Sequence, residues 1–532
     1  MIRRRDAEAA ARTRPFGAIV PGWDVVAWPG VVVLALSMLV VVLALAPVLA
    51  TPYLPVLDAA SHEARLVALR QLLLTDTGSR FYALDTMFLA NMGFDVAGMV
   101  LTGWFSPQMA GRVFQAATTV LTFTGIMALN RVAAGAWRAW PLVTALLLYN
   151  LFTLLGFFGY ELGVGLLFWA LAGRLLLVGR PVLARFAVGS VAGVVLLFCH
   201  VSAFGIYAVM LAGMGLEALW RARSTLGQVL LMGAELVPAC VLYGLMVSGG
   251  HEPPRYEWPY WRSKIFSAID TVTSGSVAGD AAFLVGAAAV ALVLALGRVR
   301  VQRPLAPGLV LLVLLYFAIP GHVSGGSYVD TRLPVVIVLL ALASCRVEMR
   351  WARAGAALMA VAGAAFVVKQ VALTVLWSAE GRALSEIAAV FERLPRGAVV
   401  FQSECYPDPY DVPAVYVSRQ PPVQHVAGMA AFGGDRFAAV SWTLKGQQPI
   451  QTAAAYRAFK DYQDGLSNKT CSQAEYRGVL EGARRVAAQQ AATGGITPPL
   501  FLLLLRPHEP NLLAGDAVMV GRTEHVELYA VP

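Results

Sequence analysis

Residues 28–65, WPGVVVLALSMLVVVLALAPVLATPYLPVLDAASHEAR, join a long apolar run to a cluster of ionisable side chains. The apolar part, about Trp28 to Ala50, is long enough to cross a hydrocarbon core of roughly 30 Å at about 1.5 Å of rise per residue. Arginines precede this run and favour a cytoplasmic N-terminus, so Asp58 is expected on the opposite face of a membrane. The stretch therefore predicts acid–base groups at an external membrane surface.

The composition indicates an α-helical polytopic membrane protein. Hydrophobic residues make up 58% of the chain and charged residues 14%, which excludes an ordinary soluble enzyme. The net charge of +9 comes from arginines in short clusters between apolar runs, which is typical of positive-inside anchoring and not of a nucleic-acid-binding domain.

The sequence predicts no metal site and no cofactor. Its cysteines and histidines lack ligand spacings such as CxxC or HExxH, and a requirement for a divalent metal stays open. Cys405 and Cys471 lie in the polar C-terminal tail. They could form a disulfide if that tail is external.

We assign each long apolar run as a transmembrane span and take the end flanked by arginines as its cytoplasmic end. This assignment predicts about eleven transmembrane helices. The predicted spans are residues 28–50, 113–130, 141–158, 161–177, 186–200, 204–219, 226–247, 281–296, 305–320, 333–344 and 354–377. This topology gives a cytoplasmic N-terminus at 1–27 and a transmembrane domain at 28–377 with a long first external loop at 51–112. An external, periplasmic domain would follow at 378–532.

The stretch from Thr86 to Phe105 decides the topology. It is apolar enough for a span, but it contains Asn91, Asp95 and glycines. If it crossed the membrane, the arginine clusters downstream would all face outward. We therefore expect an interfacial or re-entrant helix.

The C-terminal tail is expected to form a small α/β domain. Its composition changes at the LPRG turn of residues 394–397. Strands are predicted at 398–402, 414–417, 500–505 and 526–531, with a helix at 472–490.

Polar groups from several loops gather on the external side in this topology. A carboxylate there could deprotonate an acceptor hydroxyl, and arginine or lysine could hold a lipid-linked phosphate. The first loop supplies Asp58, His62 and Glu63 as candidate catalytic groups. The other candidates for binding or support are Tyr160, Glu161, His200, Trp258, Trp261, His322 and Asp330.

Several of these residues have a structural alternative. Asp58 could simply cap the helix that begins after it. His200 could be a hydrogen-bonded histidine of the bundle, and Asp330 could form an ion pair with Arg332. Glu235, inside the span at 226–247, needs a partner or a cavity.

The loop PPRYEWPYWR at residues 253–262 combines aromatic and charged residues. An aromatic belt at the membrane surface would explain Trp258 and Trp261. Sugar stacking together with phosphate contacts from Arg255, Arg262 and Lys264 is the alternative.

The order of these features resembles the GT-C membrane glycosyltransferases. An external acid follows the first span, the first loop is long, the spans are joined by short loops, and an external domain ends the chain. The segments NMGFD at 91–95, GFFGY at 156–160 and GSYVDTRLP at 326–334 are similar to bacterial multi-pass proteins of this type. The resemblance implies an inverting glycosyltransferase of the bacterial inner membrane. Such an enzyme would move a sugar from a polyprenyl-phosphate donor to an external lipid or envelope polysaccharide.

The resemblance also implies roles for individual residues. The family's catalytic acid would fall on Asp58, with Glu63 as the nearby substitute, and its phosphate site on Lys264, Arg332 and Arg255. The family often has two acids separated by one residue in this loop, and this chain departs from that pattern with Asp58-Ala59-Ala60. A transporter or flippase for a lipid-linked precursor, or a non-catalytic assembly partner, are the alternative functions.

Overall fold

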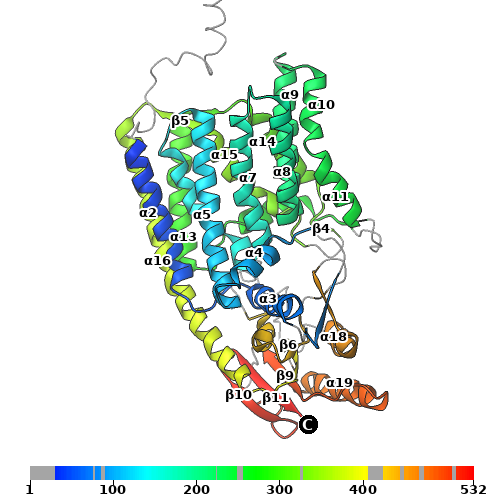
Figure 1. Ribbon diagram of the computed structural model, residues 1–532. Coiled ribbons are helices and arrows are strands. Elements are labelled where there is room, and N and C mark those ends of the chain that lie inside the picture. Colours follow the sequence, from blue (N-terminus) through cyan, green and yellow to red (C-terminus); the bar gives the residue numbers. More distant parts are fainter. Residues whose placement is uncertain are drawn as a thin grey trace, which may run out of the picture.

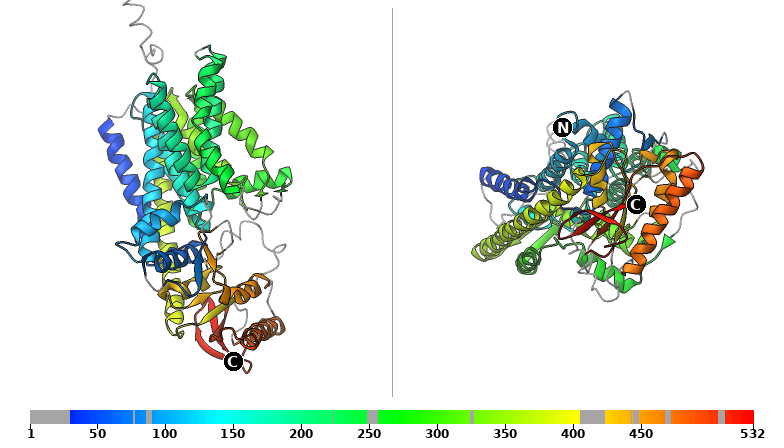
Figure 2. Two further views of the ribbon diagram at one scale, coloured as in Figure 1. Left: turned by 45° about the vertical axis from the view of Figure 1, so that its right-hand side comes forward. Right: turned by 90° about the horizontal axis from the view of Figure 1, so that it is seen from below.

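The computed structural model describes residues 30–75, 78–85, 90–222, 224–247, 256–323, 327–404, 423–441, 443, 448–466, 472–505 and 511–532. The chain is a helical multi-pass membrane protein whose long helices run side by side, with a mixed β-sheet at one end of the bundle (Figure 1). Two further views show the same division between the helical bundle and the smaller C-terminal part (Figure 2).

The helical elements of the bundle and its loops are α2 (Gly30–Leu49), α3 (Ala59–Leu74), α4 (Gly93–Leu101), α5 (Pro107–Ala134), η1 (Trp140–Leu147), α6 (Leu151–Leu155), α7 (Phe158–Leu176), α8 (Val182–Cys199), α9 (Val201–Trp220), α10 (Leu226–Ala234), α11 (Val237–Val247), α12 (Trp261–Asp270), α13 (Val277–Leu296), α14 (Ala306–Ala318), α15 (Arg332–Ser344) and α16 (Ala352–Glu392). The tail adds η2 (Val426–Gly433), η3 (Ala454–Tyr456), α18 (Arg457–Asp464) and α19 (Gln473–Ala492). The strands are β1 (Tyr82–Leu84), β2 (Tyr256–Glu257), β3 (Gly297–Val301), β4 (His322–Val323), β5 (Cys345–Met349), β6 (Val399–Glu404), β7 (Phe437–Ala438), β8 (Ile450–Thr452), β9 (Leu500–Leu505), β10 (Val518–Arg522) and β11 (Val526–Val531).

Within the described residues, seven helices are long and apolar enough to cross a membrane, or eight if α10 and α11 form one span bent by 43°. Their outer faces carry large apolar side chains that no other part of the structure covers. Val31 and Met38 of α2, for example, are each 71% exposed. Lipid is the environment in which such apolar surface is stable.

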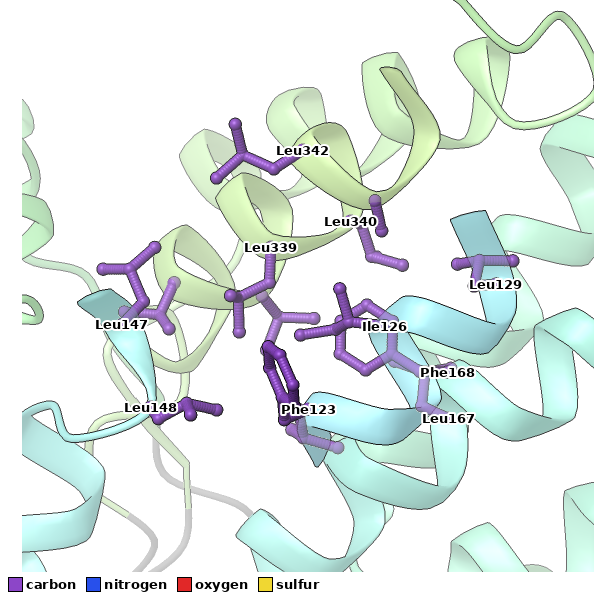
Figure 3. Close-up of a cluster of buried hydrophobic side chains, with 14 of the residues drawn as sticks. Phe123, Ile126, Leu129, Leu147, Leu148, Leu167, Phe168, Leu339, Leu340 and Leu342 are labelled. Carbon is purple, nitrogen blue, oxygen red and sulfur yellow. The ribbon is translucent and has the colours of Figure 1, made fainter. Parts of the chain in front are cut away.

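The centre of the bundle is a dense apolar core. Phe123 and Ile126 of α5 pack with Phe168 of α7 and with Leu339 and Leu340 of α15 (Figure 3). All five side chains are almost completely buried. This packing holds α5, α7 and α15 together.

The predicted span at 141–158 is not one helix, but the 3₁₀ helix η1 followed by the short α6. Asn150 breaks it: its backbone is extended, and its side-chain oxygen accepts a hydrogen bond from the Phe152 N–H at 2.9 Å. Lys369 of α16 donates to the carbonyls of Leu146 and Tyr149 at 2.7 and 2.8 Å. These contacts satisfy backbone groups that a continuous helix would have paired internally.

The first external loop contains α3 and α4 in place of a further span. α4 has nine residues, about 14 Å of helix, which is too short to cross a bilayer. The part at 86–89 lies outside the described residues. α4 is not among the candidate spans of the described residues, and that the whole stretch does not cross the membrane stays a prediction.

The opposite end of the bundle carries an arginine-rich strand pair. β3 and β5 pair antiparallel with Arg298 opposite Glu348 and Arg300 opposite Arg346. In Figure 1 β5 lies at the top, while the sheet of the tail lies at the bottom. The end of the bundle away from the C-terminal part thus carries Arg298, Arg300 and Arg346 in this strand pair.

The tail forms a five-stranded mixed sheet in the order β10-β11-β9-β6-β7. β6 is parallel to β7 and β9, and β11 is antiparallel to β9. The predicted strands at 398–402, 500–505 and 526–531 and the helix at 472–490 are confirmed, the helix starting with a capping box of Ser472 and Glu475. The strand at 414–417, Cys405 and Cys471 lie outside the described residues.

The first loop and the tail are built into each other. α16 runs unbroken from the bundle through residue 377, the predicted domain boundary, to Glu392 beside the sheet (Figure 1). β1 of the first loop pairs antiparallel with β8 of the tail, and the Tyr82 hydroxyl lies 2.8 Å from the Ser441 hydroxyl. β1 was not predicted, because a strand of three residues shows no periodicity in sequence.

The topology can be tested with reporters. A periplasmically active phosphatase fused after Pro532 should be active, and the same reporter fused in the β3–β5 end, after Arg303, should be inactive. The distribution of arginines is the physical reason. The reverse pattern of activity would place all the external loops in the cytoplasm and contradict the account.

Candidate active site

Hydrogen bonds to the C-terminal end of α6 fix the position of Asp58. The N–H groups of Leu57 and Asp58 donate to the carbonyls of Leu154 and Leu155 at 2.9 and 3.2 Å. These carbonyls belong to the last turn of α6, where a helix has no internal donors left. The first loop thus supplies hydrogen-bond donors to the last carbonyls of α6, and these bonds hold Asp58 in place.

Gly156 makes this close approach possible. It ends α6 with a φ of +76°, a conformation that favours glycine. A Cβ at this position would lie 3.2 Å from the backbone nitrogen of Asp58 and 3.3 Å from its Cβ. Any side chain here would push Asp58 away.

The carboxyl of Asp58 does not serve as a helix cap. The residue occupies the N-cap position of α3, but its side chain makes no capping hydrogen bond, and the residue as a whole is only 4% exposed. Its Oδ1 lies 3.5 Å from Nε2 of His425. Burial raises the pKa of Asp58 well above its ordinary value of 3.8, and the charge of Arg65 acts in the opposite direction. A carboxylate with raised basicity is suited to accept a proton.

Arg65 and His62 line the site from α3. Arg65 forms an ion pair with Asp95, Nε to Oδ1 at 2.5 Å, and its Nη2 lies 2.7 Å from Nδ1 of His62. Because a guanidinium only donates, Nδ1 of His62 is the acceptor, and the ring proton is on Nε2, toward the Gly156 carbonyl. Burial lowers the pKa of His62, so the ring is a neutral support and not a second base.

Glu63 faces a different neighbour. A Cβ at Gly111 of α5 would lie 2.7 Å from its Oε1, and that oxygen has no hydrogen-bond partner among the described residues. Burial raises the pKa of Glu63, with Arg112 opposing the shift. Asp58 thus lies against α6 and the residue before η2, whereas Glu63 lies against α5.

Arg332 is a cation in an aromatic surround. Its backbone carbonyl accepts a hydrogen bond from the Tyr160 hydroxyl at 2.5 Å, and its guanidinium lies 5.0 Å from the ring of Phe157 and 5.9 Å from that of Tyr160. In the part of the chain that the structure describes, it has no carboxylate partner, and its Nε is buried without a hydrogen bond. Such a group is prepared to bind an anion.

The predicted pairing of Asp330 with Arg332 is wrong, because Asp330 pairs with Lys264 at 3.2 Å. The Lys264 ammonium also donates to the carbonyls of Tyr316 and Ile319 at 2.7 and 2.6 Å. It caps the end of α14 and joins α12 to α15. With its donors engaged, we assign Lys264 to the support of these loops; Arg255 lies outside the described residues.

Tyr328 connects the two charged groups. Its ring lies 6.1 Å from that of Phe157, and its backbone has a φ of +60°, which is rare for a residue with a side chain. Burial and the charge of Asp58 raise the pKa of Tyr328. Asp58 therefore lies beside Gly156, and Arg332 lies against the ring of the next residue, Phe157. We call Asp58, His62, Gly156, Phe157, Tyr328, Arg332 and His425 the external site.

Tyr160 and Glu161 line a small internal cavity of about 30 Å³ on the bundle side of Arg332. Thr153 donates to Oε1 of Glu161 at 2.5 Å. Polar side chains of α5 also line the cavity, namely Gln115, Thr118, Thr119 and Thr122. The space holds about two water molecules, too few for a sugar.

The other predicted residues have structural contacts. Nδ1 of His200 accepts from the Ser202 N–H at 3.1 Å, so His200 caps α9. His322 lies in β4 with its Nδ1 3.3 Å from the Ser327 hydroxyl. Glu235, at the break between α10 and α11, pairs with Arg174 at 3.2 Å.

Trp258 and Trp261 are more than half exposed, at 61% and 65%. The Trp258 indole N–H donates to the Ala318 carbonyl at 3.4 Å, and Arg262 lies over the Trp261 ring. Their exposure favours the aromatic belt over a place in the external site.

Sequence reasoning missed Gly156, Phe157, Tyr328 and His425 as parts of the external site. Gly156 and Tyr328 lie in segments that carry the family resemblance, but their contacts with Asp58 depend on the tertiary fold. His425 shows no local pattern at all.

No protein-family model and no curated protein matches the chain. Solved structures do. The structure of ArnT from Cupriavidus metallidurans bound to undecaprenyl phosphate is 12% identical, with 94% of this chain and 98% of that chain covered and a TM-score of 0.48. For ArnT in the apo state the identity is 13%, the coverages are 94% and 97%, and the TM-score is 0.49. The arabinofuranosyltransferase AftD from Mycobacteria is 17% identical, with 96% of this chain but 40% of that chain covered and a TM-score of 0.47.

The similarity to each of these structures extends over most of this chain. TM-scores below 0.5 at these identities do not establish an activity. The residues of the external site have to carry that conclusion.

The role of Gly156 gives a first test of the site. We expect Gly156→Ala to lower turnover about tenfold or more, because its Cβ displaces Asp58 and small misplacements of a reacting group are costly. Gly179→Ala is the matched control, since Gly179 has a φ of +85° but nothing within 4 Å of an added Cβ. Turnover assays and thermal unfolding of both variants separate the effects. Equal losses of activity in the two variants would show that backbone strain alone is responsible.

Proposed function

We propose that this protein is an inverting membrane glycosyltransferase that moves a sugar from a polyprenyl-phosphate donor to an external lipid or envelope polysaccharide. One observation carries the proposal: a buried carboxyl with raised basicity lies beside Gly156, and a guanidinium with no carboxylate partner among the described residues lies against the neighbouring Phe157 ring. A transfer of this kind needs one group to remove a proton and another to hold a leaving phosphate.

In the proposed reaction Asp58 accepts the proton of the acceptor hydroxyl. The acceptor oxygen forms a bond to the anomeric carbon from one face, and the bond from that carbon to the phosphate oxygen breaks on the other. The configuration inverts because attack and departure occur on opposite faces. The lipid phosphate leaves with the electron pair of the broken bond, and the proton on Asp58 passes to solvent.

Arg332 is the proposed phosphate-binding residue. A guanidinium can pair with a phosphate through two parallel hydrogen bonds. The rings of Phe157 and Tyr160 hold it without neutralising it. Of the basic residues predicted for this task, Arg332 has the free donor capacity, whereas Lys264 is engaged.

The proposal includes a topology in the bacterial inner membrane. The candidate spans, the bent pair α10–α11 and three shorter apolar helices, Trp140–Leu155, Ala306–Ala318 and Arg332–Ser344, would together supply the eleven predicted spans. The external site would then face the periplasm near the membrane surface, where a polyprenyl-linked donor presents its phosphate.

A transporter is the alternative function, and Glu235 at a helix break is the feature that suggests it. Its pairing with buried Arg174 accounts for that charge within the protein.

Replacement of the base tests the proposal directly. Asp58→Asn should keep the fold and lower turnover by about two to four orders of magnitude, because an amide cannot accept the proton. Asp461→Asn, an exposed position on α18, is the control. Transfer of labelled sugar from polyprenyl-phosphate donors measures both. Full activity in Asp58→Asn would reduce Asp58 to a structural residue.

Replacement of the phosphate-binding residue tests the other half of the site. Arg332→Ala should weaken donor binding more than Arg332→Lys, since lysine keeps the charge but not the paired hydrogen bonds. Acceptor affinity should change little, and Arg300→Ala, in β3, should change neither. Direct binding of a polyprenyl-phosphate sugar measures these affinities. If Arg332→Ala bound the donor with wild-type affinity, the assignment of Arg332 as the phosphate-binding residue would be wrong.

A further inference from the structure

His425 brings the C-terminal part of the chain into contact with Asp58. It immediately precedes η2, and its Nε2 lies 3.5 Å from Oδ1 of Asp58. The imidazole is 20% exposed, compared with 6% for the carboxyl side chain. Apart from His425, the residues around Asp58 in the external site come from the bundle and its loops.

A network from the sheet holds His425 in place. The side chain of Gln402, in β6, donates to the carbonyl of Gln424 and accepts from the N–H of Ala427, so it fixes the backbone on both sides of the histidine. Gln463 of α18 in turn makes two hydrogen bonds to the Gln402 backbone, at 2.8 and 2.9 Å. The histidine is thus tied to a rigid strand.

Close packing sets η2 against α3. A Cβ at Gly428 would lie 3.0 Å from the carbonyl oxygen of Ala60, two residues after Asp58. Tyr53 stacks on Phe432 with the ring planes inclined by 10°. Gln71 donates to the Gly434 carbonyl at 2.5 Å. η2 is therefore fixed along α3, and with it the approach of His425 to Asp58.

We propose that His425 is a positioning residue whose Nε2–H donates a hydrogen bond to Asp58, so that the C-terminal domain completes the active site. This inference rests on the proposed function, in which Asp58 is the base. The bond fixes Oδ1 and leaves Oδ2 for the acceptor hydroxyl. The tail is then part of the catalytic machinery and not only a surface for the acceptor.

The charge state of the histidine suits this role. Burial lowers the pKa of His425 to about 4, so the imidazole is neutral near pH 7 and acts as a hydrogen-bond donor without adding charge. A donor to a carboxylate favours the ionised form and opposes the effect of burial on Asp58. The other titratable or charged groups that face this pair are Arg65 and His62 of α3 and Tyr328.

The pH dependence of turnover is the experiment. Asp58 must be ionised to act, so kcat falls as the pH drops through its pKa. Loss of the donor in His425→Leu should raise that pKa and move the acid limb upward by about one to two pH units. At pH values on the displaced limb, kcat should fall about 10- to 100-fold with KM unchanged, and it should recover at higher pH. His425→Gln, which keeps a donor, should retain a limb near the wild-type position.

Two reference variants complete the design. His525→Ala, between β10 and β11 of the same domain, is the matched histidine control and should leave the profile unchanged. Asp58→Asn should be inactive at every pH. Thermal unfolding of all variants shows whether the domain is still folded, and comparison of the Leu and Gln variants remains informative if both lose stability equally.

The possible results distinguish a failure of the proposed role of His425 from a failure of the proposed function. An unshifted acid limb in His425→Leu beside an inactive Asp58→Asn would overturn the role of His425 and keep the proposed function. If kcat fell by the same factor at every pH in both the Leu and the Gln variants, the role of His425 would also be overturned. Such a uniform loss indicates a packing defect, which does not shift the acid limb of the pH profile. Activity in Asp58→Asn would show that the proposed function itself fails.

Discussion

The external site depends on two backbone hydrogen bonds that join the first loop to the end of α6. Leu57 and Asp58 donate to the carbonyls of Leu154 and Leu155. A helix end inside a membrane protein must find such donors, because lipid supplies none. The same contact places Asp58 against Gly156, where only a residue without a side chain allows the approach. The hydrogen bonds that satisfy the C-terminal carbonyls of α6 thus determine where the Asp58 carboxyl lies.

The charges of the site are kept apart. Asp58 and Arg332 would neutralise each other as a direct ion pair, but in the described part of the chain Asp58 lies beside Gly156 and His425, whereas the Arg332 guanidinium lies against the Phe157 ring. Several other buried charges of the chain are paired, as Arg65 with Asp95, Lys264 with Asp330 and Arg174 with Glu235. A buried charge without a partner is costly. A phosphate would provide the Arg332 guanidinium with an anionic partner, and a substrate hydroxyl would donate a hydrogen bond to the Asp58 carboxylate.

Much of the fold follows from local patterns, whereas the site only partly does. Apolar length and arginine position predicted the long helices, and short apolar runs predicted β6, β9 and β11. Asp58 was recognised because it follows the first span. The break at Asn150, the pairing of Lys264 with Asp330 and the contact of His425 with Asp58 depend on partners far apart in the sequence. Single-sequence patterns contain no information on such contacts.

The position of a bound donor tests the central claim most directly. A structure of the protein with a polyprenyl phosphate should show the phosphate oxygens within hydrogen-bonding distance of the Arg332 guanidinium, with the lipid chain leaving toward the bilayer. The phosphate should also lie on the Arg332 side of Phe157, with Asp58 facing the space where the acceptor would enter. A phosphate bound instead at Lys264 and the Trp258–Trp261 loop, away from Asp58, would contradict the account.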